Sequence, residues 1–236
     1  MKILVTGASR GIGRALAAAA AHEGHDVVVN YQLAADQADG LVGELAAAPG
    51  RAIALQADVS LGDDARRLVE ATVDQLGGLD CVVNNAGVGV AIPIEDLDEA
   101  TFNHTLQVNL TGAFLVSQAA WPHMTAKGGR LVFLSSGAAR TGGRLSAAYA
   151  ASKAGLEGLM HYYATNLRQH RITANAIAPS LVQSDMLGSM PAPSAENLPM
   201  GRLGRPEEVW PALRMILETE YLTGQTIHID AGRYMT

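Results

Sequence analysis

Short apolar runs rich in β-branched residues alternate along the chain with longer, alanine-rich stretches in which apolar residues recur at helical spacing. The apolar runs have the length of strands, and the amphipathic stretches have the length of helices. The pattern predicts strands at 2–6, 26–30, 51–57, 79–87, 129–136, 171–180 and 224–230, and helices at 12–24, 33–48, 61–76, 98–126, 147–170 and 206–218. Ser60, with Asp63 three residues later, is the expected N-cap of the third helix.

Strands that are apolar almost throughout, each followed by a helix, indicate a parallel sheet covered on both faces. Right-handed crossovers then give a doubly wound fold. We therefore expect one α/β domain over residues 1–236, a Rossmann-type doubly wound parallel sheet of about seven strands flanked by helices. The stretch 181–201, rich in Pro, Ser and Met, breaks the alternation. We interpret it as a short substrate lid around residues 183–200, and the alternative is a surface loop without a function.

The composition indicates a globular protein and argues against several classes of partner and location. The chain has 236 residues, of which 48% are hydrophobic and 17% charged, so it can bury a large core. Its net charge of −6 and the lack of a basic run argue against nucleic acid as a partner. The single cysteine excludes an intrachain disulfide, and no apolar run approaches the ~18 residues of a membrane helix. A cytoplasmic location with no membrane association is therefore expected.

The segment TGASRGIG, residues 6–13, follows the first predicted strand and opens the first predicted helix. Gly7 permits a sharp turn, and Gly11 and Gly13 let the backbone approach a pyrophosphate at the helix N-terminus. In this context the glycines predict a dinucleotide site, which would include Ser9, Arg10 and Ile12. A glycine-rich turn without a ligand is the alternative.

The second predicted strand ends in VVVNYQ, where a reader of NAD usually has a carboxylate for the ribose hydroxyl. Asn30 and Tyr31 would not repel a 2′-phosphate, and Arg10 could pair with one. This favours NADP(H) over NAD(H). The remaining expected adenosine contacts follow the third and fourth predicted strands and are Asp58, Val59, Asn85, Ala86 and Gly87.

Tyr149 and Lys153 are four residues apart in an alanine-rich helical stretch, which places them on one helix face. Ser136 ends the preceding strand, at the edge where doubly wound sheets bind ligands. Asn109 lies inside a predicted helix, where its propensity is poor. Taken alone, the Tyr/Lys pair is equally compatible with ordinary helix packing.

The set of motifs TGASRGIG, NNAG, VNLTG, YAASK and APS, with Ser136 placed before Tyr149, resembles the short-chain dehydrogenase/reductase family over essentially the whole chain. The segments VVVNY, RITANAIAP, GRLGRPEEV and TGQTIHIDAG are most similar to the 3-oxoacyl-acyl-carrier-protein reductases of that family. The resemblance implies a catalytic set of Asn109, Ser136, Tyr149 and Lys153. Tyr149 and Lys153 would also contact the cofactor, and Pro179, Val182 and Ser184 would lie near the nicotinamide. A homotetramer or dimer is implied as well.

Several positions depart from the family pattern. Ser180 replaces the usual glycine after Pro179, and the segment 186–199 is shorter than the common lid. Where carrier-protein reductases present two arginines to the acidic carrier, this chain has Lys127 and His170, with Arg171 adjacent. An acyl carrier protein is therefore a possible partner only.

The function expected from the sequence is NADPH-dependent reduction of a ketone, in particular a 3-oxoacyl thioester on acyl carrier protein or coenzyme A. The alternatives are a reductase for another small carbonyl compound and a non-catalytic dinucleotide sensor. The seven histidines show no metal-ligand spacing, so no metal is expected.

Overall fold

Seven parallel strands form one sheet in the order β3-β2-β1-β4-β5-β6-β7, in a computed structural model that describes residues 1–184 and 198–234. The strands are β1 (Lys2–Val5), β2 (Asp26–Tyr31), β3 (Ala52–Gln56), β4 (Cys81–Asn84), β5 (Gly129–Leu134), β6 (Ile172–Pro179) and β7 (Thr226–Ile229). The predicted Rossmann-type sheet and its strand count are confirmed. The predicted lid around residues 183–200 lies largely outside the described residues.

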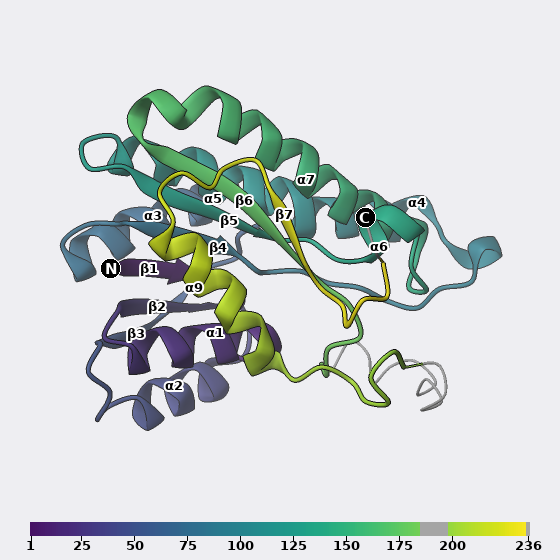
Figure 1. Ribbon diagram of the computed structural model, residues 1–236, viewed down its shortest axis with the longest axis horizontal. Coiled ribbons are helices and arrows are strands. Elements are labelled where there is room, and N and C mark those ends of the chain that lie inside the picture. The colour runs from purple at the N-terminus through teal and green to yellow at the C-terminus, as the bar shows by residue number, and fades with distance from the viewer. Residues whose placement is uncertain (185–197, 235–236) are drawn as a thin grey trace.

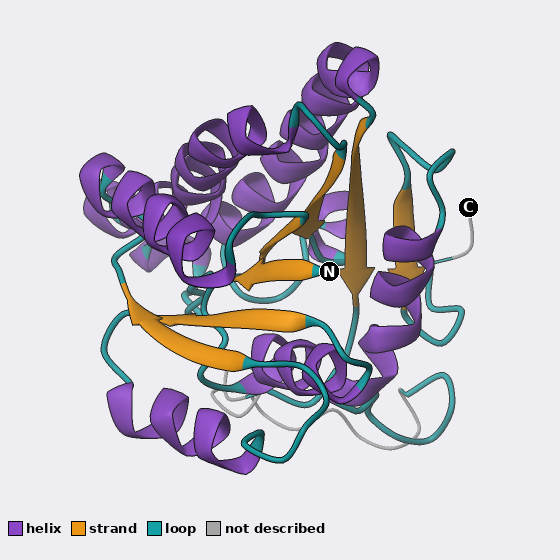
Figure 2. Ribbon diagram, turned by 90° about the vertical axis from the view of Figure 1, so that its left-hand side faces the viewer, coloured by secondary structure: helices purple, strands orange, loops and turns teal. Residues whose placement is uncertain are grey.

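Helices cover both faces of the sheet (Figures 1 and 2). One layer contains α1 (Gly11–His22), α2 (Ala35–Glu44) and α9 (Trp210–Glu218), and the other contains α3 (Gly62–Leu76), α5 (Gly112–Ala120) and α7 (Ala147–Leu167). Shorter helices are α4 (Glu99–Leu106) and α6 (Ala138–Thr141), with 3₁₀ turns at Ile94–Asp96, Trp121–Met124, Arg168–His170 and Pro206–Val209. Within the described residues, none of the helices has the length and apolar character needed to cross a membrane.

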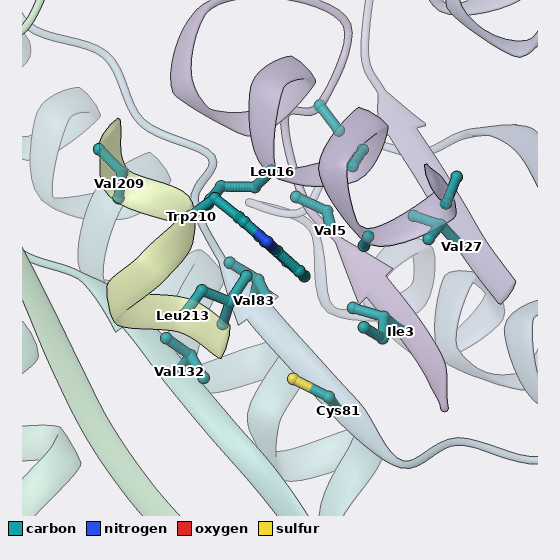
Figure 3. Close-up of a cluster of buried hydrophobic side chains, with 14 of the residues drawn as sticks. Ile3, Val5, Leu16, Val27, Cys81, Val83, Val132, Val209, Trp210 and Leu213 are labelled. Atoms are coloured by element: carbon teal, nitrogen blue, oxygen red, sulfur yellow. The ribbon is translucent and has the colours of Figure 1, made fainter. Parts of the chain in front are cut away.

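Each helical layer buries its own apolar cluster against the sheet. Figure 3 shows the cluster beneath α1 and α9, in which Trp210 and Leu213 of α9 lie over Val83 and Val132 of the central strands. The indole N–H of Trp210 is not left without a hydrogen-bond partner, because Nε1 donates to Glu23 Oε1 at 2.7 Å. Burial of apolar side chains on both faces explains why the central strands β1, β4 and β5 are apolar almost throughout.

The strand order places a topological switch between β1 and β4, whose neighbours continue in opposite directions. Ile3 pairs with Val27 of β2 on one side and with Cys81 of β4 on the other. The loops that leave the carboxyl ends of β1 and β4 therefore diverge, and a crevice opens between them.

One local prediction is corrected by the structure, and another is refined by it. Ser60 does not cap α3, which begins at Gly62 after Leu61; instead the Ser60 N–H and hydroxyl donate to Asp58 Oδ1 at 2.9 and 2.6 Å. The segment 98–126 is helical over most of its length, as predicted, and a π-helical turn at Gln107–Thr111, which contains Asn109, joins α4 to α5. A π turn inserts an extra residue and often marks a functional position.

Candidate active site

A cavity of about 610 Å³ opens at the carboxyl ends of the strands, in the crevice predicted by the strand order. All eighteen residues that the sequence predicts as cofactor contacts line it: Gly7, Ser9, Arg10, Gly11, Ile12, Gly13, Asn30, Tyr31, Asp58, Val59, Asn85, Ala86, Gly87, Tyr149, Lys153, Pro179, Val182 and Ser184. Of the predicted catalytic residues, Ser136, Tyr149 and Lys153 line the cavity, and Asn109 lies behind its wall.

The turn between β1 and α1 leaves room for a phosphate group. Gly7 and Gly11 have positive φ angles of 61° and 57°, and a Cβ added to Gly11 would meet nothing within 4 Å. The α1 helix begins there with no acidic residue in its first turn and no side chain capping its N-terminus. Its first N–H groups and the positive end of its dipole therefore fit a dinucleotide pyrophosphate.

Gly13 has a different role, because it allows α1 to pack closely on the rest of the site. A Cβ at this position would overlap Asn85 Nδ2 and would lie 2.7 Å from the Gly7 carbonyl oxygen. Asn85 Nδ2 occupies that space because it donates to the carbonyls of Thr6 and Gly7 at 2.9 and 3.0 Å. The loop after β4 is thus fastened to the turn after β1.

Asn30 at the end of β2 also holds the β1–α1 turn in place through hydrogen bonds. Its Oδ1 accepts from the Gly7 N–H at 3.2 Å, and its Nδ2 lies 3.2 Å from the carbonyl oxygens of Leu55 and Ala57. These bonds occupy the Asn30 amide, so the side chain holds the turn in place. The sequence predicted Asn30 as a cofactor contact, but it did not indicate that its side chain holds the glycine turn.

Asp58 is the only carboxylate among the described residues that line the cavity. One of its oxygens accepts from Ser60, and the other accepts from Gln32 Nε2 at 2.7 Å. The end of β2 therefore presents Tyr31, Gln32 and Leu33 to the cavity and no acid.

Tyr149 and Lys153 lie in the first two turns of α7. Ser146 caps this helix by accepting from the Tyr149 N–H at 3.3 Å, which fixes where the helix starts. Lys153 is buried, its Nζ donates to the Leu134 carbonyl at 2.6 Å, and it lies 5.6 Å from the centre of the Tyr149 ring. Burial lowers the pKa of Lys153 from 10.5 to about 8. Burial also raises the pKa of Tyr149, and hydrogen bonding to the Ser136 side chain offsets part of that rise.

Two serines at the end of β5 have different surroundings. The Ser135 hydroxyl is buried within hydrogen-bonding distance of the Lys153 carbonyl, at 3.2 Å, and of Glu157 Oε1, at 2.9 Å, so it braces α7 against the sheet. Ser136 lines the cavity, and its Oγ accepts from the Ala138 N–H at 3.2 Å. Both serines line the cavity, but the Ser135 hydroxyl is taken up by these contacts with α7, whereas the Ser136 side chain hydrogen-bonds to Tyr149.

Asn109 in the π turn connects two walls of the site. Its Oδ1 accepts from the Val88 N–H at 2.7 Å, while its Nδ2 donates to the Val88 carbonyl at 2.9 Å and to Ser152 Oγ at 3.0 Å. A Cβ on Gly87 would lie 3.3 Å from Asn109 Oδ1 and 3.6 Å from Lys153 Nζ. Asn109 therefore reaches the neighbourhood of Lys153 from behind Gly87.

Sequence reasoning missed the contribution of the C-terminal segment. Arg233 and Tyr234 line the catalytic end of the cavity, and a Cβ on Gly137 would lie 2.8 Å from Tyr234 Cε2. Arg144, from the connection between α6 and α7, was missed as well. The only available signal was position, since residues that follow strands of a parallel sheet gather at its ligand-binding edge.

The basic residues expected to receive a carrier protein lie elsewhere. Lys127 precedes β5, and His170 and Arg171 precede β6, so all three are at the amino ends of the strands. The Arg171 side chain donates to the Ala126 carbonyl at 3.2 Å, which brings the two segments together. The cavity opens at the opposite edge of the sheet.

Comparisons with known proteins assign the chain to a family. A family model described as Enoyl-(Acyl carrier protein) reductase matches residues 7–233. A 3-oxoacyl-[acyl-carrier-protein] reductase of Synechocystis sp. is 38% identical over 237 residues, which cover 98% of this chain and 96% of that protein. The chain belongs to the short-chain dehydrogenase/reductase family.

Other members of this family are similar over the same length. An uncharacterized oxidoreductase of Methylorubrum extorquens is 37% identical, with 97% of this chain and 96% of that protein covered. The crystal structure of a protein from Sinorhizobium meliloti 1021, provisionally assigned as a short-chain alcohol dehydrogenase, superposes with a TM-score of 0.89 at 33% identity. That superposition covers 98% of this chain and 94% of the solved one, so the family fold extends over nearly all of both.

Within residues 1–184 and 198–234, no three His, Cys, Asp or Glu side chains gather closely enough to hold a metal ion. Cys81 is a core residue, and burial raises the pKa of its thiol.

Proposed function

We propose that this protein reduces a 3-oxoacyl thioester to the corresponding secondary alcohol with NADPH. The observation that carries the proposal is that one cavity holds both the phosphate-binding turn of α1 and the side chains of Ser136, Tyr149 and Lys153. Relatives named 3-oxoacyl-[acyl-carrier-protein] reductase support the substrate class.

In the proposed reaction a bound reduced nicotinamide dinucleotide supplies a hydride to the carbonyl carbon. The Tyr149 hydroxyl gives its proton to the carbonyl oxygen, and Ser136 donates a hydrogen bond to the same oxygen while charge develops there. Both groups line the cavity, and the Ser136 side chain already lowers the pKa of Tyr149 against the effect of burial.

Lys153 favours proton release from Tyr149. With a pKa of about 8, its ammonium is mainly charged at pH 7, and its Nζ lies 5.6 Å from the centre of the phenol ring. A positive charge at this distance stabilises the phenolate relative to the phenol. We also assign to this ammonium the binding of the nicotinamide ribose, and to Asn109 the anchoring of a water that connects Lys153 to solvent.

The preference for NADPH is also part of the proposal. Arg10 lines the adenosine end of the cavity. Among the described residues there, Asp58 is the single carboxylate that could repel a 2′-phosphate. Asp58 is already hydrogen-bonded to Ser60 and Gln32. An arginine at this end attracts a 2′-phosphate and makes no comparable contact with a 2′-hydroxyl.

A second candidate function is reduction of a small ketone that is not carried on a thioester. It is favoured by the position of Lys127, His170 and Arg171, because a carrier docked there would face away from the cavity of the same chain. In an oligomer, the same carrier could serve the cavity of another copy. We expect a cytoplasmic homotetramer or dimer, with the α7 face 156–167 as the contact, and light scattering in solution tests the assembly.

A substrate screen with an active-site variant tests the function. Purified enzyme is supplied with 3-oxoacyl thioesters, free ketones and quinones while NADPH absorbance is followed. Tyr149→Phe should lower kcat on the best substrate about a hundredfold or more and leave the Kd of NADPH nearly unchanged. Tyr221→Phe, at a fully exposed tyrosine, is the matched control. Wild-type turnover by Tyr149→Phe would disprove the mechanism, and a preference for free ketones would select the second candidate.

A further inference from the structure

Two arginines border the catalytic end of the cavity, although they come from distant parts of the sequence. Arg144 lies between α6 and α7, and Arg233 lies in the segment after β7. Figure 1 shows this last segment ending beside α6. A Cβ on Gly137 would touch Tyr234, and a Cβ on Gly143 would lie 2.7 Å from Ala138 Cβ, so both segments pack against the chain directly after Ser136.

The charge at this end of the cavity is unbalanced. The single carboxylate in the described lining, Asp58, belongs to the adenosine end. Elsewhere on the surface, arginines pair with acids, as Arg66 does with Asp63 at 2.9 Å and Arg202 with Glu208 at 2.7 Å. Among the described residues, neither Arg144 nor Arg233 has a carboxylate within ion-pairing distance. In a chain with a net charge of −6, two such arginines at one cavity mouth form a local positive site.

The backbone on both sides of Arg144 is fixed. Gly142 and Gly143 make a turn with φ angles of 79° and 68°, conformations that favour glycine. The next side chain, Leu145, is buried, and its carbonyl accepts from the Ile92 N–H at 2.9 Å. Arg144 is therefore held at the cavity mouth by its neighbours, and only its side chain is free to adjust.

Arg233 is fixed by a compact turn around Asp230. The Asp230 carboxylate accepts from the N–H groups of Gly232 and Tyr234 at 2.9 and 3.1 Å, and its carbonyl accepts from the Arg233 N–H at 3.1 Å. The Arg233 guanidinium lies 5.2 Å from the centre of the Tyr234 ring, which in turn packs on Gly137. One aromatic ring thus separates this charge from the chain beside Ser136, and little side-chain freedom is lost when a ligand binds.

We propose that Arg144 and Arg233 bind an anionic group of the substrate, a phosphate or a carboxylate, while its ketone contacts Tyr149 and Ser136. The inference rests on the proposed function, because it names what the 3-oxoacyl thioester carries. Two sources share this chemistry: the phosphate of a phosphopantetheine arm and a carboxylate at the end of the acyl chain. Either would form charge-assisted hydrogen bonds with the guanidinium groups.

Two matched substrate pairs test the proposal and separate the sources. The 3-oxobutanoyl thioesters of pantetheine and of 4′-phosphopantetheine differ in one phosphate. The pantetheine thioesters of 3-oxohexanoate and 3-oxoadipate differ in one terminal carboxylate. The readout is the ratio of kcat/KM for the charged member to kcat/KM for the uncharged member of each pair. Wild-type enzyme should show a ratio of about ten in one pair, which falls as ionic strength rises.

The double variant Arg144→Gln/Arg233→Gln should bring that ratio close to one. Arg140→Gln is the control, since Arg140 is an exposed arginine of α6 outside the cavity lining, and it should retain the wild-type ratio. The KM of NADPH is measured in parallel. A ratio unchanged in the double variant, no preference in either wild-type pair, or a loss confined to NADPH binding would each overturn the proposal.

A binding measurement keeps this proposal distinct from the proposed function. If wild-type enzyme reduces none of the thioesters, the proposed function fails and the arginines are tested by calorimetric titration. The titrants are 4′-phosphopantetheine and adipate, with NADPH-loaded protein. Binding of either compound that weakens at least fivefold in the double variant supports the anion site, and absence of binding by both compounds overturns it.

Discussion

The dinucleotide end and the catalytic end of the cavity are built on opposite principles. At the dinucleotide end, the groups that shape the site also hold the fold together: Asn30 fastens the β1–α1 turn, and the absence of a side chain at Gly13 lets Asn85 reach the same turn. At the catalytic end, an ammonium is buried with one carbonyl as its hydrogen-bond acceptor, which disfavours folding. Binding and folding thus reinforce each other at one end and compete at the other.

The largest expected effect follows from filling the space at Gly13. A Cβ there would overlap Asn85 Nδ2 and approach Gly7 O and Ala8 Cα to 2.7 and 3.0 Å, contacts that only a backbone shift can relieve. Gly13→Ala should lower the free energy of unfolding by about 3 kcal/mol and weaken NADPH binding more than tenfold. Urea unfolding and fluorescence titration measure the two effects.

Gly43→Ala is the matched control for this substitution. Gly43 lies within α2, where a Cβ meets nothing within 4 Å, so alanine should stabilise the helix by about 0.5–1 kcal/mol. If Gly13→Ala loses cofactor binding and keeps wild-type stability, folding and binding are separable at this end and the comparison fails.

The glycine turn after β1 and the pairing of Tyr149 with Lys153 could be predicted from the sequence because their determinants are local. A glycine pattern after a strand, and a tyrosine and lysine one helical turn apart, place these groups without knowledge of distant contacts. Arg144, Arg233 and Tyr234 could not be found in this way, because only the folded sheet brings their segments beside Ser136. The brace from Asn109 to Val88 and Ser152 was hidden for the same reason.

Ser60 shows how a local pattern can predict the wrong partner. A serine followed by an acid three residues later satisfies the sequence rule for a helix cap. In the folded chain, Asp58 competes for the Ser60 hydroxyl at 2.6 Å, and the helix starts two residues later without a side-chain cap. The bond belongs to the turn that lines the adenosine end, so site geometry takes precedence over helix capping here.

An intermediate effect is expected at Arg10, where binding can be changed without disturbing the glycine turn. Arg10→Ala removes the cation that we assign to the 2′-phosphate and should reduce the preference for NADPH over NADH, measured as the ratio of kcat/KM values, by about tenfold. Stability should change by less than about 0.5 kcal/mol, since this arginine is exposed. If Arg10→Ala keeps the same ratio as the wild-type enzyme, the preference for NADPH depends on another residue. If the wild-type enzyme itself prefers NADH, the proposed preference for NADPH is wrong.

The smallest expected effect distinguishes the catalytic end most directly. Burial lowers the pKa of Lys153 to about 8, whereas an unfolded lysine keeps its proton to about pH 10.4, so the folded state gains stability from this group as the pH rises from 7 to 9. The gain is about 1 kcal/mol, and Lys153→Met lacks it. The free energy of unfolding of the variant, relative to wild type, should therefore be highest at pH 7 and should be about 1 kcal/mol lower at pH 9. The variant should also lose its reductase activity.

Urea unfolding of cofactor-free protein at both pH values measures the difference, with exposed Lys127→Met as the control. A stability difference between Lys153→Met and wild type that is independent of pH would mean that the ammonium is solvated in the folded state, and the two ends of the cavity would then not differ in the way described.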